Sequence, residues 1–266
     1  MKDKRVVIIF GIIFFASVCL LFSFYPDFTA ESERSAFPGD VIIAARLQGH
    51  YLVDEFEKKE TADKGPINQR FADIGDGVQV YMRSAGAQYP RKVLLLHGQA
   101  YTSETWEQIK TLEVLSGAHY HAIAVDLPGY GNSRKTDQYP HTIYLEKLID
   151  GLNLNMPVVI SPSMSGIFSV PYVLSHCDKV TGYVPVSPVI NQKYGLSDFR
   201  NCSAPTLSVY GENDGSAAHR NQLLRSMPKC QLKMIPNGEH PCYLDDPDLF
   251  HKYLLDFFSE LKWPSQ

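Results

Sequence analysis

The strongest constraint on the fold is a series of apolar runs that each end in a polar, glycine-rich turn. Four of these turns carry a chemically useful side chain, namely Gln99, Ser163, Asp214 and His240. The runs alternate with helical patterns, which predicts a mostly parallel sheet with helices on both faces. Because ligands of such sheets bind outside the carboxyl ends of the strands, we expect these four residues along one rim.

The expected elements follow from the hydrophobic runs and the turn residues between them. A hairpin is predicted where residues 71–74 and 78–81 flank a Gly-Asp-Gly turn. Strands and helices then alternate as strand 93–97, helix about 104–117, strand 120–125, helix about 142–152, strand 157–161, helix 164–176, strand 180–186, strand 205–210, helix about 216–227, strand 231–235 and helix 246–261. These segments are enough for one domain with a substantial core.

The segment Ser161-Pro162-Ser163-Met164-Ser165-Gly166 predicts a sharp turn between a buried strand and a helix. Such a turn strains the backbone of the serine at its apex and exposes the hydroxyl. The positions two before and two after the apex must be small, and here they are Ser161 and Ser165. Ser163 is therefore the candidate nucleophile. Ser165 is an alternative nucleophile, but the need for a small residue at its position explains this serine better than a catalytic role does.

Taken together, these motifs resemble the α/β-hydrolase superfamily over roughly residues 68–262. The motifs that carry the resemblance are His97-Gly98, Asp126-x-Pro128-Gly129-x-Gly131-x-Ser133, the turn at Ser163, Gly211-x-x-Asp214 and Gly238-x-His240. They follow the family's order of nucleophile, acid and histidine. The Ser-Pro-Ser-x-Ser-Gly turn and the run 240–245 are most similar to the group called α/β-hydrolase domain-containing protein 14, and the N-terminal segment resembles that of its membrane-anchored member. The difference from the superfamily is serine in place of glycine on either side of Ser163.

A serine hydroxyl reacts only with a base beside it and a third group that orients the base. His240 can take the proton of Ser163, and Asp214 can hold the imidazole and stabilise its charged form. The resemblance implies an oxyanion hole formed by the backbone N–H groups of Gln99 and Met164, where one donor is worth about 3–4 kcal/mol of barrier. These roles predict a serine hydrolase or acyl transferase. The alternative is a non-catalytic, membrane-tethered binding or adhesion protein on the same fold.

Other interpretations of these polar residues remain open. Asp214 could be only a turn residue, and Glu239 is an alternative acid, although adjacent residues rarely face each other well. We interpret His97 as a turn residue, and Asp126 and Arg134 as residues that shape a loop. The other histidines are interpreted as solvated or capping residues: His50, His119, His121, His141, His176, His219 and His251.

The sequence lacks the motifs of metal-binding, cofactor-binding and nucleic-acid-binding proteins. It contains no Cys-x-x-Cys, no His-Glu-x-x-His and no phosphate-binding Gly-Lys-Ser/Thr loop, so we expect neither a metal nor a cofactor. The formal net charge is −4, without a basic cluster in the expected domain, which argues against nucleic acid as a partner.

The N-terminal part predicts a membrane anchor. Val6–Tyr25 is a run of 20 residues without a charge, the length at which an apolar helix crosses a bilayer. Basic residues precede the run and acidic residues follow it, which by the positive-inside rule leaves the N-terminus in the cytosol. A cleaved signal peptide is the alternative, but its apolar region would span only about 7–15 residues. We therefore expect a single-pass type II membrane protein with a cytosolic tail 1–5, a signal anchor 6–25, a stalk 26–66 and a lumenal or extracellular hydrolase domain 67–266.

The cysteines fit a domain that is exported to an oxidising compartment. Cys19 lies in the predicted anchor, and the four others can pair in three ways. Cys202 and Cys230 precede strands that should be neighbours, so the layout favours a bridge between them. Asn201-Cys202-Ser203 is an N-glycosylation acceptor, and we expect Asn201 at the edge of the sheet opposite the site.

The substrate class follows from the length of one connection. About 17 residues separate Ser187 from Pro205, too few for the multi-helix cap that many members of the superfamily have. An open site shelters small acyl groups, such as acetyl or butyryl, better than long lipid tails. Tyr101, Tyr130 and Ile167 are candidate pocket walls. We expect a small acyl ester, thioester or acylated substrate, whose acyl acceptor and protein partners the residue pattern does not identify.

Overall fold

The computed structural model of the chain describes residues 66–264. The predicted anchor at 6–25 and the predicted stalk, apart from its last residue, lie outside the described residues. Within residues 66–264, none of the helices combines the length and the hydropathy that crossing a membrane requires.

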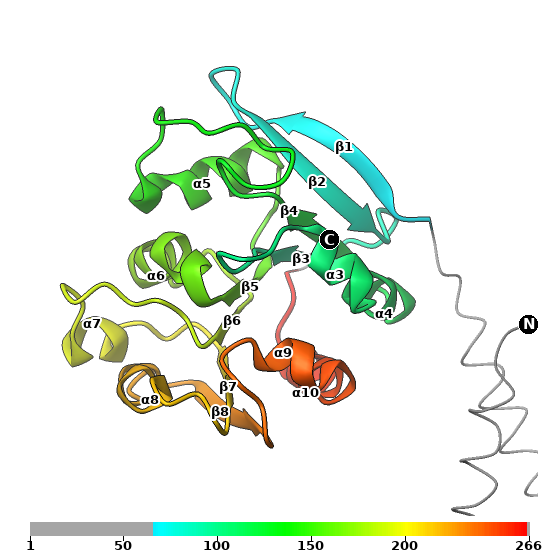
Figure 1. Cartoon of the computed structure of the whole chain (residues 1–266). Helices are drawn as coiled ribbons and strands as arrows, with labels where there is room; N and C mark the ends of the chain where they lie inside the picture. Colours follow the sequence, from blue (N-terminus) through cyan, green and yellow to red (C-terminus); the bar gives the residue numbers. More distant parts are fainter. Residues whose placement is uncertain (1–65, 265–266) are drawn as a thin grey trace, which may run out of the picture. The chain divides into compact units, whose positions relative to one another are not determined.

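The described strands form one eight-stranded sheet in the order β1-β2-β4-β3-β5-β6-β7-β8 (Figure 1). β2 is antiparallel to β1 and β4, and the remaining pairs are parallel. The bounds are β1 (Asn68–Asp73), β2 (Gln79–Ala85), β3 (Lys92–Leu95), β4 (His121–Val125), β5 (Val158–Pro162), β6 (Gly182–Val186), β7 (Thr206–Gly211) and β8 (Cys230–Ile235). The prediction of a mostly parallel sheet is confirmed.

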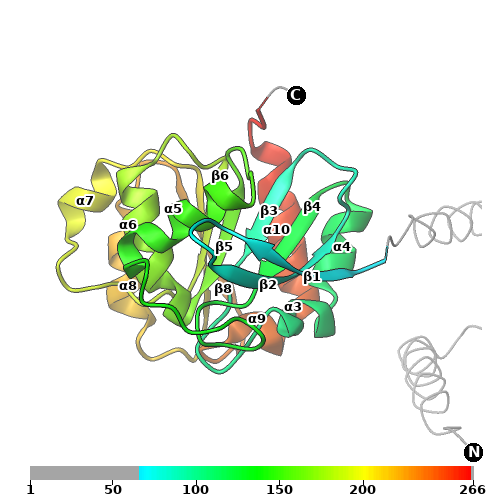
Figure 2. The same cartoon turned by 90° about the horizontal axis from the view of Figure 1, so that it is seen from above.

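Helices cover both faces of this sheet, as the view in Figure 2 shows. Helices α5, α6 and α8 pack on one face, whereas α3, α4 and α10 pack on the other. The bounds are α3 (Glu104–Gln108), α4 (Thr111–Gly117), α5 (His141–Gly151), α6 (Gly166–Ser175), α7 (Leu196–Arg200), α8 (Ala217–Arg225), α9 (Cys242–Asp245) and α10 (Pro247–Glu260).

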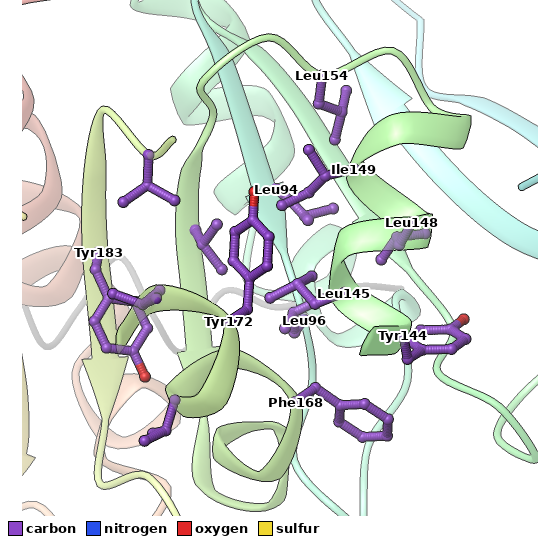
Figure 3. Packing of buried hydrophobic residues seen from close by; sticks show 14 of the residues in the cluster. Leu94, Leu96, Tyr144, Leu145, Leu148, Ile149, Leu154, Phe168, Tyr172 and Tyr183 are labelled. Atoms are coloured by element: carbon purple, nitrogen blue, oxygen red, sulfur yellow. The ribbon is translucent and has the colours of Figure 1, made fainter. Parts of the chain in front are cut away.

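The central strand β3 is buried on both faces. Leu94 joins the core beneath α5 and α6, while Val93 and Leu95 join the core beneath α4 and α10. Because strand side chains alternate between faces, a continuous apolar run is what a strand between two helical layers requires. Leu145 of α5 and Tyr172 of α6 belong to the same core cluster as Leu94, and all three are labelled in Figure 3. Burying one such large side chain contributes about 1.5–3 kcal/mol.

Two local expectations were wrong. The helix predicted at about 104–117 is divided into α3 and α4, because Lys110 adopts a left-handed backbone conformation with φ 63°. His251, expected to be a solvated or capping residue, is buried on α10, and its Nε2 lies 2.9 Å from the Thr111 hydroxyl. The hydrogen bond to Thr111 compensates for the water that the imidazole loses on burial.

Candidate active site

Ser163 lies at the apex of a tight turn between β5 and α6. Its φ is 47°, a left-handed conformation that is costly for a residue with a Cβ, and a short 3-10 turn leads from it into α6. The loop after β6 holds this turn, because the Val189 N–H donates to the Ser163 carbonyl at 2.7 Å. Gly166 permits that approach, since a Cβ there would lie 2.4 Å from the Val189 oxygen.

The structure brings Ser163, His240 and Asp214 into one hydrogen-bonded array. The Ser163 Oγ lies 2.8 Å from His240 Nε2, and His240 Nδ1 lies 2.9 Å from Asp214 Oδ2. A carboxylate can only accept, so Nδ1 carries a proton and Nε2 is free to accept the serine proton. The side chain of His240 is 43% exposed and that of Asp214 only 3%. Solvent and substrate therefore reach the serine end of the array.

Both oxygens of the Asp214 carboxylate are held by donors. The Ser216 hydroxyl and N–H donate to Oδ1 at 2.7 and 3.1 Å. The Arg220 Nη2 donates to Oδ2 at 2.5 Å, the same oxygen that His240 contacts. Burial raises the pKa of Asp214, but hydrogen bonds from Ser216 and His240 outweigh it and hold that pKa well below its usual range. Asp214 is thus ionised at neutral pH.

The turns that carry Asp214 and His240 are packed against each other. The Asn213 N–H donates to the Gly238 carbonyl at 2.8 Å, and the Asn213 side chain donates to the Asn237 carbonyl at 3.1 Å. Gly211 makes this approach possible, because a Cβ there would lie 2.3 Å from the Gly238 oxygen. The distance between acid and histidine therefore depends on the contact between the turns that follow β7 and β8.

The loop at Gln99 lies beside the nucleophile. A Cβ on Gly98 would be 3.7 Å from the Ser163 Cβ, and the Gln99 N–H has no acceptor among the described residues. His97 holds this loop, because its Nδ1 contacts the Gly98 carbonyl at 2.8 Å and its Nε2 accepts the Leu127 N–H at 2.9 Å. Burial lowers the pKa of His97, which keeps the ring neutral. Met164 opens the turn into α6, where the first N–H groups have no partner within the helix.

A chain of buried hydroxyls lies beneath the nucleophile. Ser165 donates to the Pro162 carbonyl at 2.8 Å and lies 2.9 Å from the Ser161 hydroxyl. Ser161 lies 2.6 Å from Ser169, which lies 2.9 Å from the Tyr183 hydroxyl. Since each hydroxyl has one proton, the chain is directed from Tyr183 towards Pro162. Ser165 is therefore held inside the protein, whereas Ser163 contacts His240.

The remaining polar residues lie elsewhere. Asp126 is buried and accepts the N–H groups of Ser103 and Asn132 at 2.8 Å each, so it shapes a loop. Glu239 is exposed, and its N–H donates to Asp245. Arg134 lines a cavity of about 460 Å³ beside β2, whose lining includes no member of the Ser163 array. Within residues 66–264, no group of three His, Cys, Asp or Glu side chains could hold a metal ion.

The three side chains predicted as pocket walls lie beside the His97-Gly98 turn and on α6. Tyr101 would be 3.3 Å from a Cβ on Gly98, and the Tyr130 ring lies 5.2 Å from the His97 ring. Ile167 and Met164 are half-buried against the core beneath α6. Sequence reasoning missed Ser216 and Arg220, since neither belongs to a recognisable motif.

The disulfide is not the expected one. Cys202 is bonded to Cys177, whereas Cys230 is a free thiol. β7 and β8 are neighbours as predicted. Cys202, however, lies in the segment between α7 and β7, where its Sγ is 3.5 Å from the Val173 carbonyl of α6. The bridge joins the end of α6 to the segment before β7. Asn201 is exposed beside it, at the end of α7.

The sheet order and the turns at the carboxyl ends of its strands define an α/β-hydrolase fold. The model of the alpha/beta hydrolase family matches residues 93–188. The structure of a CIB-like hydrolase from Thermoplasma acidophilum superposes with a TM-score of 0.68 at 22% identity, over 73% of this chain and 98% of that one.

Two curated relatives are more similar in sequence. "Putative protein-lysine deacylase ABHD14B" of Rattus norvegicus is 39% identical over 64% of this chain and 83% of its own length. Protein ABHD14A of Danio rerio is 40% identical over 67% of this chain and 68% of its own length. The chain therefore belongs to the α/β-hydrolase family, in the group of ABHD14A and ABHD14B.

Proposed function

We propose that this hydrolase is a serine hydrolase that forms an acyl intermediate on Ser163. The observation that carries the proposal is the continuous array from Ser163 Oγ to His240 at 2.8 Å and from His240 to Asp214 at 2.9 Å. In this geometry one imidazole accepts the serine proton while the buried carboxylate stabilises the resulting charge.

The reaction follows from the positions of these groups. Ser163 Oγ attacks the acyl carbonyl as His240 Nε2 takes its proton, and the carbonyl oxygen becomes an oxyanion. The N–H groups of Gln99 and Met164 are the proposed donors to that oxygen. His240 then protonates the leaving group, and the acyl group stays on Ser163. Water, or another acceptor in an acyl transferase, gives up a proton to His240 and releases the acyl group.

The proposed substrates are small acyl esters, thioesters or acylated amines. The connection between β6 and β7 contains only the short helix α7, and His240 is 43% exposed, so no cap in that part of the described chain shelters a long acyl group. The ABHD14B relatives are named for protein-lysine deacylase activity. An acylated lysine fits the array, because the amine leaving group needs the proton that His240 carries.

An active-site probe tests the proposal. A fluorophosphonate should label the protein, and Ser163→Ala should abolish both the labelling and the hydrolysis of p-nitrophenyl acetate. Ser165→Ala is the matched control and should retain most of the labelling. A folded wild-type protein that the probe does not label would instead support the alternative of a non-catalytic, membrane-tethered binding protein. Equal losses in both variants would show that Ser163 is not the nucleophile.

We also propose that the domain is lumenal or extracellular on a type II anchor at Val6–Tyr25. The apolar run supports the anchor, and the Cys177–Cys202 disulfide and the exposed Asn201 support an oxidising compartment. The full-length protein should resist carbonate extraction from microsomes, and the domain should be protected from external protease. Peptide:N-glycosidase should shift the band, except in Asn201→Gln. An unglycosylated domain that external protease digests would reverse the orientation.

A further inference from the structure

Asp214, the candidate catalytic acid, is contacted by Arg220 as well as by His240 and Ser216. Its Nη2 donates to Asp214 Oδ2 at 2.5 Å, and its Nη1 donates to the Ser216 hydroxyl at 2.7 Å. Ser216 in turn donates to Asp214 Oδ1 at 2.7 Å. The three side chains therefore form a closed ring of hydrogen bonds. In this ring the guanidinium holds one carboxylate oxygen directly and the other through Ser216. The Arg220 side chain is 15% exposed, so this ion pair is largely shielded from water.

We propose that Arg220 is a positioning residue of the serine-hydrolase mechanism, which orients the Asp214 carboxylate and opposes the build-up of positive charge on His240. The inference rests on the proposed function, because it assigns a role within that array. Arg220 contacts neither the nucleophile nor a reacting atom, and it acts through Asp214.

The reason lies in the oxygen that Arg220 and His240 share. Arg220 Nη2 lies 2.5 Å from Asp214 Oδ2, and His240 Nδ1 lies 2.9 Å from the same oxygen. An arginine is always protonated, so a protonated His240 would place a second positive charge on the other side of one carboxylate oxygen. The imidazolium is therefore less stable than it would be beside Asp214 alone. The charge of Arg220 therefore favours the return of the proton from His240 to the leaving group.

Other charged groups near His240 come from its own loop and from α9. Glu239 is its exposed neighbour, and Asp245 of α9 accepts the Glu239 N–H. The Cys242 thiol is buried, and burial raises its pKa to about 12, so it stays neutral. Asp214 is the carboxylate that contacts the imidazole, and Arg220 donates to the same carboxylate. Changing Arg220 therefore isolates its effect from these other charges, which stay constant.

The test compares three variants by the pH dependence of kcat/KM for p-nitrophenyl acetate. In Arg220→Gln the charge is lost, and the acid limb should move to higher pH by about one unit. In Arg220→Lys the charge remains but the link to Ser216 is lost, so the limb should stay in place while the plateau falls about tenfold. Arg225→Gln, on the exposed face of the same helix, is the control and should change neither.

Each outcome decides the inference. An Arg220→Gln variant with the wild-type limb would show that Arg220 only stabilises α8, and an Arg220→Lys variant with a wild-type plateau would remove the positioning role. If Arg220→Gln does not fold, the Arg220→Lys result decides. An NMR titration of the His240 ring in wild type and Arg220→Gln reads the same shift without needing turnover. Failure of the fluorophosphonate to label Ser163 would refute the proposed function, whereas labelling together with an unmoved limb refutes the Arg220 role alone.

Discussion

Adding one methyl group at Gly211 should separate the candidate acid from the candidate base. Gly211 ends β7 where the turn bearing His240 passes over it. In Gly211→Ala the new Cβ would lie 2.2 Å from the Glu239 carbonyl oxygen and 2.3 Å from that of Gly238. Both atoms belong to the backbone, so no side chain can rotate away to make room.

The size of the effect follows from these distances. Ordinary van der Waals contact begins near 3.4 Å, so the two turns must move apart by about 1 Å. The Asn213–Gly238 hydrogen bond of 2.8 Å and the His240–Asp214 contact of 2.9 Å both cross this gap. A misplacement of about 1 Å costs about 100-fold in rate, or about 2.7 kcal/mol of barrier. The strain should also lower the free energy of unfolding by about 1–3 kcal/mol.

Gly215→Ala is the matched control. It lies in the same turn, next to Asp214, and a Cβ there meets nothing within 4 Å. Hydrolysis of p-nitrophenyl acetate and urea unfolding should be measured for both variants. Gly215→Ala should resemble the wild type, whereas a folded Gly211→Ala should lose most of its kcat. A Gly211→Ala variant within threefold of the wild type in rate would refute the argument that this contact sets the His240–Asp214 distance.

Three further predictions concern stability. Ser161→Ala breaks the buried hydroxyl chain in its middle, so urea denaturation should give a free energy of unfolding that is lower by about 2–3 kcal/mol. Tyr183→Phe removes only the end of the chain and should lower the free energy of unfolding by about 1 kcal/mol. Equal losses in the two variants would contradict this hydrogen-bond chain. The Cys177–Cys202 bridge closes a segment of 25 residues, so Cys177→Ser should lower the free energy of unfolding, measured by thermal denaturation, by about 3 kcal/mol. Cys230→Ser should lower it much less. Peptide mapping without reductant should recover the bridge. Burial, with Lys92 and Arg70, lowers the pKa of His121 from 6.5 to about 4. The unfolded chain therefore binds this proton first, and stability should fall as the pH drops from about 6.5 to about 4, less steeply in His121→Asn; parallel stability curves would contradict this.

Local chemistry explains why so much of the site could be predicted. A strand, a tight turn and a helix follow one another within a few residues at Ser163, and such patterns depend on nearest neighbours along the chain. The same holds for the runs that end at Asp214 and His240. A parallel sheet must then align those ends on one edge, so the approach of three distant residues was foreseeable.

The features that the sequence did not reveal depend on contacts between distant segments. Cys202 bonds to Cys177 because α7 carries it against the end of α6, although β7, which follows Cys202, is indeed the neighbour of β8, which begins at Cys230. The break at Lys110 has no proline or glycine to mark it, and it lets α3 and α4 pack separately on the sheet.

The amino-acid sequence by itself determined the strands, the longer helices, the parallel sheet and the three polar turns, because each rests on local periodicity and on the steric demands of short turns. Tertiary structure decided how Arg220 of α8 returns to the carboxylate that His240 uses, and how Tyr183, Ser169 and Ser161 join into one buried chain. The physical reason is that hydrogen bonds between buried groups depend on the packing of whole elements, which fixes side-chain positions to within fractions of an ångström.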